Sequence, residues 1–367
     1  MKFMDLRVKE NRLREEIRKV FEEVLETGWY VGGHFVDEFE SEFARWLGVE
    51  HVVSVSSGTD ALKYALWSLG IKKGDEVITT PLTFIATAEA VALLGAKPVF
   101  VDVEPDTFLI DPEKIEEAIT EYTRAILPVH LFGSVADMDR INEIGERYGI
   151  HVIEDAAQAH GALYKGKRAG SLGTSSTFSF YPTKNLSAFG EAGAVATNSG
   201  EIAEKVYMLK NHGQKATYYS LFIGENGRMD AIQAGILLKK MEYIDKWNEK
   251  RKKLAAIYLE ELSNMEEIKV QQIPDGVESV YHLFVILHPE RDKLREELER
   301  EGVPSRVYYQ VPLHLQPAFS YLGYKKGDFP ETEKISSQLL ALPIGPWMEE
   351  DDVKKIVNSL KKAILRI

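Results

Sequence analysis

The sequence predicts an α/β fold with two parts, a large domain built on a mostly parallel mixed sheet and a smaller C-terminal α+β domain. Between about residues 50 and 200, short runs rich in β-branched residues alternate with segments of helical periodicity, as expected for a sheet covered by helices. The length of 367 residues is also more than one hydrophobic core usually supports. We expect an N-terminal helix and the large domain to span residues 1–245, and the small domain to span residues 246–367.

The spacing of apolar residues predicts the individual elements. Glu10–Thr27 has the periodicity of an amphipathic helix that lies on the large domain. Ala231–Lys253 predicts one long helix that leads to the small domain, where Tyr281–Leu287 predicts a strand and Arg291–Glu301 a helix. The strands predicted for the large domain are Val52–Val55, Glu76–Thr79, Lys97–Val101, Ala125–Pro128, His151–Ile153, Thr177–Phe180 and Gly193–Thr197.

Two reactive side chains follow predicted strands of this sheet. The predicted strand His151–Ile153 is followed by Glu154 and then Asp155, and Lys184 follows the run Thr177–Tyr181. Ligands of such sheets bind beyond the strand ends. A lysine amine can form a Schiff base with pyridoxal 5′-phosphate (PLP), and a carboxylate can keep the pyridine nitrogen protonated. Taken singly, each residue has an ordinary interpretation, a solvated lysine and an aspartate that caps a turn.

A phosphate-binding turn and a ring-stacking residue are predicted upstream. Ser56–Asp60 joins a predicted strand to a segment of helical periodicity, so the N–H groups of Gly58 and Thr59 can face an anion at a helix N-terminus. An ordinary helix cap is the alternative, and no Gly-Lys-Ser/Thr follows that would make a P-loop. Phe84 follows the strand Glu76–Thr80 and can stack on a flat ring, with a core phenylalanine as the alternative.

These motifs and others in the same order resemble the DegT/DnrJ/EryC1/StrS family of sugar aminotransferases. The resemblance covers nearly the whole chain and implies the fold-type I architecture of PLP-dependent transferases. The motifs that carry it are Met4–Leu6, Gly28–Gly33, Phe39-Glu40, Ser57–Leu62, Gly74–Ile78, Pro128–Gly133, Glu154–Gly161, Ser179–Asn185, Asn211–Gly213, Asn226–Asp230 and Pro312–Pro317.

The resemblance also implies roles for single residues. Lys184 would carry the cofactor and move the proton, and Asp155 would pair with the pyridine nitrogen. Asn226 would cross a dimer interface to reach the phosphate in the neighbouring subunit. The other residues expected to bind the cofactor are Gly58, Thr59, Phe84, Gln158 and Ser179. The residues expected to bind substrate are Tyr30, Arg228, Tyr308 and His314.

The implied reaction moves an amino group from L-glutamate to a nucleotide-linked keto-sugar in a homodimer with shared active sites. The loop Asn211–Arg228 is expected to make dimer contacts. Asn226–Asp230 is similar to an Asn-Ser-Arg-Leu-Asp pattern of 3-keto-sugar aminotransferases, which favours amination at C3. Gly227 and Met229 depart from that pattern, so C4 stays open. The motifs do not distinguish dTDP, UDP and GDP.

Two other functions fit the same resemblance. PLP-dependent nucleotide-sugar dehydratases have a histidine in place of the Schiff-base lysine, whereas Lys184 occupies that position here. A non-catalytic sensor or regulatory protein could keep the fold without the chemistry. Two observations argue against a regulatory protein. The chain keeps the full set of Lys184, Asp155, Gln158 and Ser179, and it has no evident DNA-binding helix-turn-helix.

Composition narrows the function further. A net charge of -12 disfavours a nucleic-acid partner, and a nucleotide sugar would need a local basic pocket. Candidates for that pocket are Lys210, His212, Arg228 and Arg306. The sequence has 0 Cys, and its 9 His show no ligand spacing, so we expect no metal. No signal region or long apolar run occurs, so we expect a cytoplasmic protein without a membrane partner.

Overall fold

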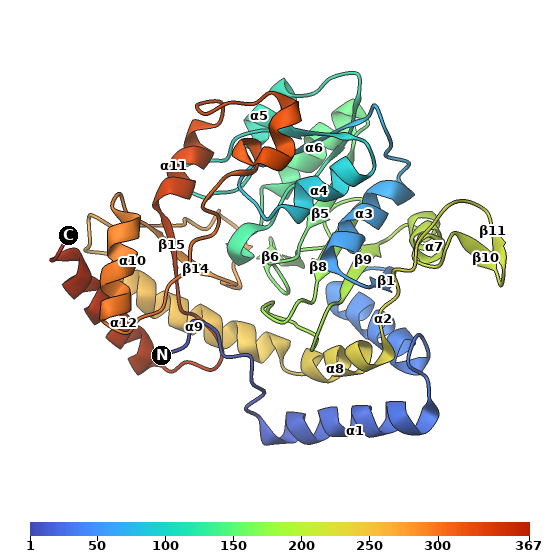
Figure 1. Cartoon of the computed structure of the whole chain (residues 1–367), viewed down its shortest axis with the longest axis horizontal. Coiled ribbons are helices and arrows are strands. Elements are labelled where there is room, and N and C mark those ends of the chain that lie inside the picture. The colour runs from blue at the N-terminus through green and yellow to red at the C-terminus, as the bar shows by residue number, and fades with distance from the viewer.

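The computed structural model describes residues 1–367, and a seven-stranded sheet organises its larger part (Figure 1). The strand order is β1-β9-β8-β5-β4-β2-β3, and only β9 runs antiparallel to its neighbours. The mostly parallel mixed sheet expected from the sequence is therefore confirmed. The strands are β1 (His51–Val55), β2 (Glu76–Thr79), β3 (Lys97–Phe100), β4 (Thr123–Ile126), β5 (His151–Asp155), β8 (Ser175–Ser179) and β9 (Gly193–Thr197).

Helices cover both faces of this sheet because successive strand residues point to opposite sides. In β2, Val77 packs with the cluster around α3, α4 and α7, whereas Ile78 packs with the cluster around α5 and α6. Over β1, β9 and β8, helices α2 and α8 cover the face opposite α3 and α7. The helices are α1 (Asn11–Thr27), α2 (His34–Leu47), α3 (Gly58–Ser68), α4 (Ala86–Leu93), α5 (Pro112–Glu117), α6 (Met138–Tyr148), α7 (Gly200–Leu209) and α8 (Ala231–Met241).

The C-terminal part is built on a small antiparallel sheet of order β12-β14-β15. In β14, Phe284 and Ile286 face the helices of this part, while Val285 and Leu287 join the core of the larger part. Its elements are α9 (Ile244–Leu262), β12 (Lys269–Val270), β14 (Phe284–Leu287), α10 (Arg291–Arg300), η2 (Leu313–Leu315), η3 (Pro317–Leu322), α11 (Pro330–Gln338), β15 (Leu339–Leu342) and α12 (Glu350–Ile364). The division at residue 245 stays a prediction.

Two predicted elements differ from the structure. The single helix Ala231–Lys253 is wrong, because α8 ends at Met241 and α9 begins at Ile244. No proline or glycine marks this break. The two helices bury their apolar faces against different partners, α8 against α1 and α2 and α9 against α12, so packing sets the break. The strand predicted from Tyr281 begins only at Phe284, because Tyr281 has a left-handed φ of 43°.

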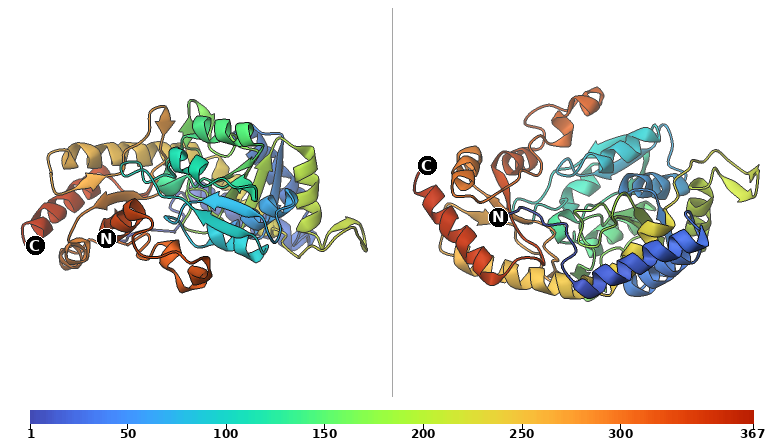
Figure 2. Two further views of the ribbon diagram at one scale, coloured as in Figure 1. Left: turned by 90° about the horizontal axis from the view of Figure 1, so that it is seen from above. Right: turned by 60° about the horizontal axis from the view of Figure 1, so that its bottom comes forward.

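A hairpin of β10 (Gln214–Ala216) and β11 (Tyr219–Ser220) projects from the body of the molecule (Figure 2). Tyr218 in its turn is 95% exposed, and Ile223 in the segment that follows β11 is 81% exposed. A second small sheet joins β13 (Val277–Glu278) to β6 (Leu163–Tyr164) and β7 (Lys167–Arg168). None of the helices has the length and apolar character that crossing a membrane requires.

Asp102 holds the C-terminal part onto the larger part. This buried carboxylate lies beyond β3 and accepts hydrogen bonds from the backbone N–H groups of Glu331 at 3.0 Å and Thr332 at 2.9 Å, and from the Thr332 hydroxyl at 2.7 Å. These groups belong to the first turn of α11, whose N-cap residue Phe329 has no capping side chain. Asp102 therefore caps this helix from a distant segment and matches its dipole.

We expect Asp102→Ala to lower the free energy of unfolding by about 1–3 kcal/mol, because the N–H groups of α11 lose their buried acceptor. Thermal melting and urea denaturation would measure the change. The matched control is Asp106→Ala, which removes an exposed carboxylate paired with Lys269 and should change stability by less than about 0.5 kcal/mol. Equal stability of the two variants would contradict the role of Asp102.

Candidate active site

A cavity of about 580 Å³ opens where the strand ends of the large sheet meet the C-terminal part. It gathers residues that are far apart in the sequence, from Met4 near the N-terminus to Tyr309 in the loop after α10. The residues predicted from the sequence that line it are Gly58, Thr59, Phe84, Asp155, Gln158, Ser179, Lys184 and Tyr308.

Asp155, the last residue of β5, is a buried carboxylate in the wall of this cavity. Its Oδ2 accepts a hydrogen bond from the Thr87 hydroxyl at 2.8 Å, and its Oδ1 accepts one from the Ala157 N–H at 3.2 Å. Burial raises the pKa of Asp155, while these donors and the nearby Lys184 lower it. A protonated ring nitrogen in the cavity would fit this site, since it would supply the countercharge that a buried carboxylate needs.

The neighbouring Glu154 fixes the loop that joins β5 to β8. This carboxylate is fully buried and lies 2.9 Å from the Nε2 atom of His130. It accepts three more hydrogen bonds, at 2.7–2.8 Å, from the backbone N–H groups of Gly170, Leu172 and Gly173. A loop held in this way restricts the ends of both strands, and thereby the places of Asp155 and Lys184.

Lys184 lies in a tight turn after β8, where its N–H donates to the Tyr181 carbonyl at 2.9 Å. Burial lowers the pKa of the Lys184 amine to about 8, and the charge of Asp155 opposes part of this shift. An amine with this pKa is neutral in a substantial fraction of molecules near pH 8, in contrast to an exposed lysine. Lys184 can therefore act as a nucleophile and as a base.

The first turn of α3 forms an anion-binding cradle. The Ser57 hydroxyl accepts a hydrogen bond from the Asp60 N–H at 3.1 Å. The backbone carbonyl of Ser57 accepts one from the Ala61 N–H at 3.0 Å. The N–H groups of Gly58 and Thr59 come before these and stay available to a ligand. A Cβ atom on Gly58 would lie 2.5 Å from the Cβ of Ser179, so glycine is required there. This cradle fits a phosphate group.

Aromatic and amide side chains form the mouth and floor of the cavity. Phe84 is 55% exposed and lies with its ring centroid 6.2 Å from that of Tyr309. Gln158 donates to the Tyr309 hydroxyl at 3.2 Å and accepts from the Phe132 N–H at 2.9 Å. Tyr309, Thr87 and His282 also line the cavity and were not predicted. Of these three, only Tyr309 could have been found from the sequence, because it follows the predicted Tyr308 and aromatic pairs often line binding sites.

Four predicted site residues lie outside this cavity. Tyr30 and Asn226 are exposed, and Arg228 donates to the Asn226 side chain at 3.0 Å. Arg228 lines a separate cavity of about 380 Å³. His314 is buried, with Nε2 3.1 Å from the Glu333 carboxylate and its ring against Phe329. The roles assigned to these four residues stay proposals. Within one chain, the His314 side chain contacts Phe329 and Glu333.

The basic residues predicted to surround a nucleotide sugar are also dispersed. Lys210 is buried, and its amine donates to the Ser54 carbonyl at 2.8 Å and pairs with Glu40 at 3.3 Å. Arg306 lies over the ring of Phe3 at 5.7 Å. Lys210 therefore serves the packing of its own chain, and its burial lowers its pKa.

The structure explains the glycine at position 227, where the family pattern suggested serine. A Cβ atom on Gly227 would lie 2.1 Å from the hydroxyl oxygen of Tyr64, which itself donates to Glu225 at 3.2 Å. The Gly227 carbonyl also accepts from the Ser56 N–H at 2.9 Å, beside the anion-binding cradle. The departure from the pattern is thus a packing consequence of Tyr64, and by itself it says little about the sugar carbon.

Comparison with known proteins identifies the family. Residues 11–361 match the model of the DegT/DnrJ/EryC1/StrS aminotransferase family. The chain belongs to this family. It is 44% identical to the "pleiotropic regulatory protein" of Geobacillus stearothermophilus, over 97% of this chain and 96% of that protein. It is 41% identical to the dTDP-3-amino-3,4,6-trideoxy-alpha-D-glucose transaminase of Streptomyces venezuelae, over 100% of this chain and 96% of that protein.

The fold is shared with solved members of the family. The crystal structure of S. venezuelae DesV superposes with a TM-score of 0.97 at 41% identity and covers 100% of this chain and 99% of that chain. The protein is therefore a PLP-dependent aminotransferase with the fold-type I architecture. The cavity with Lys184, Asp155 and the α3 cradle fits this cofactor in charge and in the placement of its donors.

The lowered pKa of Lys184 leads to a pH-dependent prediction. When PLP is added to the cofactor-free protein, the rate of its covalent capture should rise with pH and level off, with a midpoint near the pKa of about 8. The neutral amine is the reactive form, and burial makes it available at a lower pH than the value of about 10.4 for an exposed lysine. Stopped-flow visible absorbance would measure the rate. Lys184→Ala is the control, because it cannot form the absorbance band of covalently bound PLP. A capture rate that climbs steadily to pH 10 would contradict the assigned pKa of Lys184.

Proposed function

We propose that this aminotransferase moves the amino group of L-glutamate to C3 of a nucleotide-linked keto-sugar. The observation that carries the proposal is the approach of the Lys184 amine and the Asp155 carboxylate in one cavity of about 580 Å³. That volume suits a ligand larger than an amino acid. The S. venezuelae relative, whose name describes a 3-amino sugar linked to dTDP, supports the sugar and the carbon.

Each residue of the cavity contributes a separate part of the chemistry. When bound, the cofactor supplies an electron sink for the carbanion that forms at the donor Cα. The Lys184 amine would remove the proton from this carbon and deliver it to the cofactor side of the bond, and the Asp155 carboxylate would keep the ring nitrogen protonated. The N–H groups of Gly58 and Thr59 hold the phosphate, with the Ser179 hydroxyl beside them.

The mouth of the cavity suits the acceptor. Phe84 would stack on the cofactor ring, and Tyr308 and Tyr309 near it form an aromatic rim that can cover a sugar ring and keep water from the reacting carbon. Gln158, held between Phe132 and Tyr309, is placed to reach the hydroxyl side of the cofactor ring. In this proposal Tyr30 and Arg228 act from the neighbouring subunit, since neither lines the cavity of its own chain.

A non-catalytic regulatory role is the second candidate, because the Geobacillus relative is named as a regulatory protein. The complete set of ionisable groups weighs against it. Burying Lys184 and Asp155 together without using them would cost stability that an ordinary apolar pair would not. A dehydratase is less well supported, because Lys184 occupies the position where such relatives have histidine.

We further propose a homodimer in which each subunit completes the site of the other. Asn226 is exposed and does not line the cavity of its own chain. The hairpin of β10 and β11 projects from the body of the molecule (Figure 2). Tyr218 in its turn and Ile223 after it are 95% and 81% exposed, so their apolar parts have no cover within the chain. A second copy would cover this surface and bring Asn226 toward a phosphate cradle.

The proposed function predicts two separable half-reactions. L-Glutamate alone should bleach the visible band of the cofactor-loaded protein and release one equivalent of 2-oxoglutarate per site, and a nucleotide-linked 3-keto-sugar should then restore the band. Visible absorbance and chromatography of the keto acid would follow both steps. Lys184→Ala should do neither, because no other amine lies at the reacting carbon.

Three outcomes would redirect this proposal. A band that persists with glutamate would exclude it as the donor, and a protein that gains no band from added PLP would favour the regulatory candidate. Turnover of a 4-keto-sugar in place of the 3-keto isomer would move the amination to C4.

Shared sites predict complementation between two inactive variants. Lys184→Ala removes the amine from one subunit, and Asn226→Asp places a negative charge against the phosphate from the other. Reassembly of an equal mixture should restore about a quarter of the wild-type activity, because half of the dimers have one intact site of two. Turnover at limiting PLP would measure this recovery, with each variant alone as the control. No recovery in verified mixed dimers would place Asn226 in its own site or outside both sites.

A further inference from the structure

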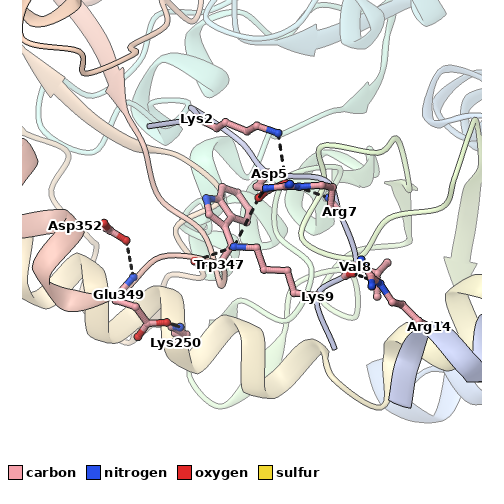
Figure 3. Close-up of polar contacts among 10 residues, drawn as sticks. All are labelled: Lys2, Asp5, Arg7, Val8, Lys9, Arg14, Lys250, Trp347, Glu349 and Asp352. Atoms are coloured by element: carbon pink, nitrogen blue, oxygen red, sulfur yellow. Dashed lines mark hydrogen bonds and ion pairs between the residues drawn. The ribbon is translucent and has the colours of Figure 1, made fainter. Parts of the chain in front are cut away.

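A second, smaller cavity of about 120 Å³ lies against Lys184. It shares the lining residues Met4, Thr183 and Lys184 with the large cavity, so the two cavities adjoin at these three residues. The N-terminal segment, residues 4–10, forms one wall and crosses Trp347, where the Lys9 amine lies 3.5 Å from the Trp347 carbonyl (Figure 3). Nothing in the proposed chemistry so far uses this space.

Arg251 of α9 lines this cavity and is only 3% exposed. Its Nη1 donates to three carbonyl oxygens, of Tyr281 at 3.1 Å, His282 at 3.4 Å and Ile344 at 3.2 Å. Its Nε and Nη2 atoms make no hydrogen bond, and no carboxylate lies within 4.0 Å of the guanidinium. Buried arginines are rarely left without a counter-ion, so this one has an edge available for an anion.

The carboxylates on the cavity wall are already engaged elsewhere. Asp5 accepts from Arg7 Nε at 2.7 Å, and the Arg7 Nη2 atom pairs with it at 2.5 Å, as Figure 3 shows. Glu10 accepts from the indole N–H of Trp247 at 3.0 Å. Neither of them forms an ion pair with Arg251, so the cavity lacks an anion of its own for this guanidinium.

A second cation faces the same space. Lys240 of α8 is 6% exposed, and its amine donates to the Ser187 carbonyl at 2.7 Å and to the Ser187 hydroxyl at 3.2 Å. Burial lowers the pKa of Arg251 to about 9 and that of Lys240 to about 8, and the charge of Glu10 opposes part of the Lys240 shift. Both shifts record the cost of holding positive charge in this small space, and a bound anion would relieve that cost.

Another buried arginine shows that the fold does pair such groups. Arg291 is 4% exposed and donates to the carbonyls of Ser336 at 3.2 Å and Leu339 at 3.1 Å, much as Arg251 does. It differs in that its Nε atom also binds the Asp292 carboxylate at 2.8 Å. Arg291 is a structural residue with its counter-ion supplied by the chain. Arg251 has the same carbonyl contacts and lacks the counter-ion.

We propose that Arg251, with Lys240 on the wall of the same cavity, binds a carboxylate group of the amino-acid donor while the donor's amino group lies at Lys184. The inference rests on the proposed transfer from an amino acid and names the residues that recognise this substrate. The Nε–Nη2 edge of a guanidinium presents two parallel donors that match a carboxylate. A cavity of about 120 Å³ accepts such a group and excludes a nucleotide sugar, so donor and acceptor have separate recognition sites.

Substitution of Arg251 tests the proposal on each half-reaction separately. Arg251→Met should lower kcat/KM for the glutamate half-reaction by about 10- to 100-fold, the loss expected for a charge-assisted pair of hydrogen bonds. The rate of the keto-sugar half-reaction, started from protein already carrying the amino group, should change by less than about 2-fold. Arg251→Lys, which keeps the charge without the fork, should fall between wild type and Arg251→Met.

The matched control is Arg291→Met, which removes the same kind of carbonyl contacts at a site that has its own counter-ion. Binding of glutarate, a dicarboxylate without an amine, adds a readout that does not depend on turnover. Calorimetry should show glutarate binding to wild type and Arg291→Met, and about 10-fold or greater weakening in Arg251→Met. Melting curves would confirm that the compared proteins are folded.

The outcomes separate this inference from the proposed function. If wild-type protein does not respond to glutamate, the donor itself is wrong. If wild type responds and Arg251→Met matches Arg291→Met in both assays, the role of Arg251 is overturned. Should Arg251→Met fail to fold, Lys240→Met and Arg251→Lys carry the test, and unchanged glutarate binding in both would overturn the proposal.

Discussion

The structure depends on keeping two opposite charges buried at the end of one sheet. Asp155 and Lys184 lie in the same cavity, and desolvation raises the pKa of the acid and lowers that of the amine. A buried carboxylate in such a pair depends on hydrogen-bond donors supplied by the protein. Thr87 supplies a donor to the carboxylate, and the four contacts of Glu154 fix the loop between the strands. The reactive pair is therefore a product of the sheet topology.

The sequence predicted the parts of this arrangement that have local signals. Lys184, Asp155 and the turn at Gly58 each follow a strand with a recognisable pattern, and parallel strand ends meet at one edge. The break between α8 and α9 had no such signal, since neither proline nor glycine occurs there. It follows from packing against two different partners, and contacts of that kind are not visible in the spacing of residues along one helix.

His314 and Arg251 also show that the sequence pattern around a residue does not reveal its tertiary contacts. His314 lies in a motif that suggested a substrate contact, yet its ring packs on Phe329 and pairs with Glu333. Arg251 lies in a long charged helix where an arginine is normally a solvated residue. Its significance is the missing counter-ion, and this becomes visible only when Tyr281, Ile344 and the N-terminal segment are placed around it.

The distribution of charge connects these observations. The chain has a net charge of -12, yet the buried cations Lys184, Lys240 and Arg251 line two adjoining cavities, and none of them forms an ion pair within 4.0 Å. Their desolvation costs stability in the ligand-free protein, and the anionic groups of the cofactor and of the donor would return part of it on binding. Discrimination can arise from the same source, because a neutral analogue of the donor would leave Arg251 buried and unpaired. The acidic surface repels anions while these interior positions attract them, so local placement of charge, and not net charge, determines which substrates bind.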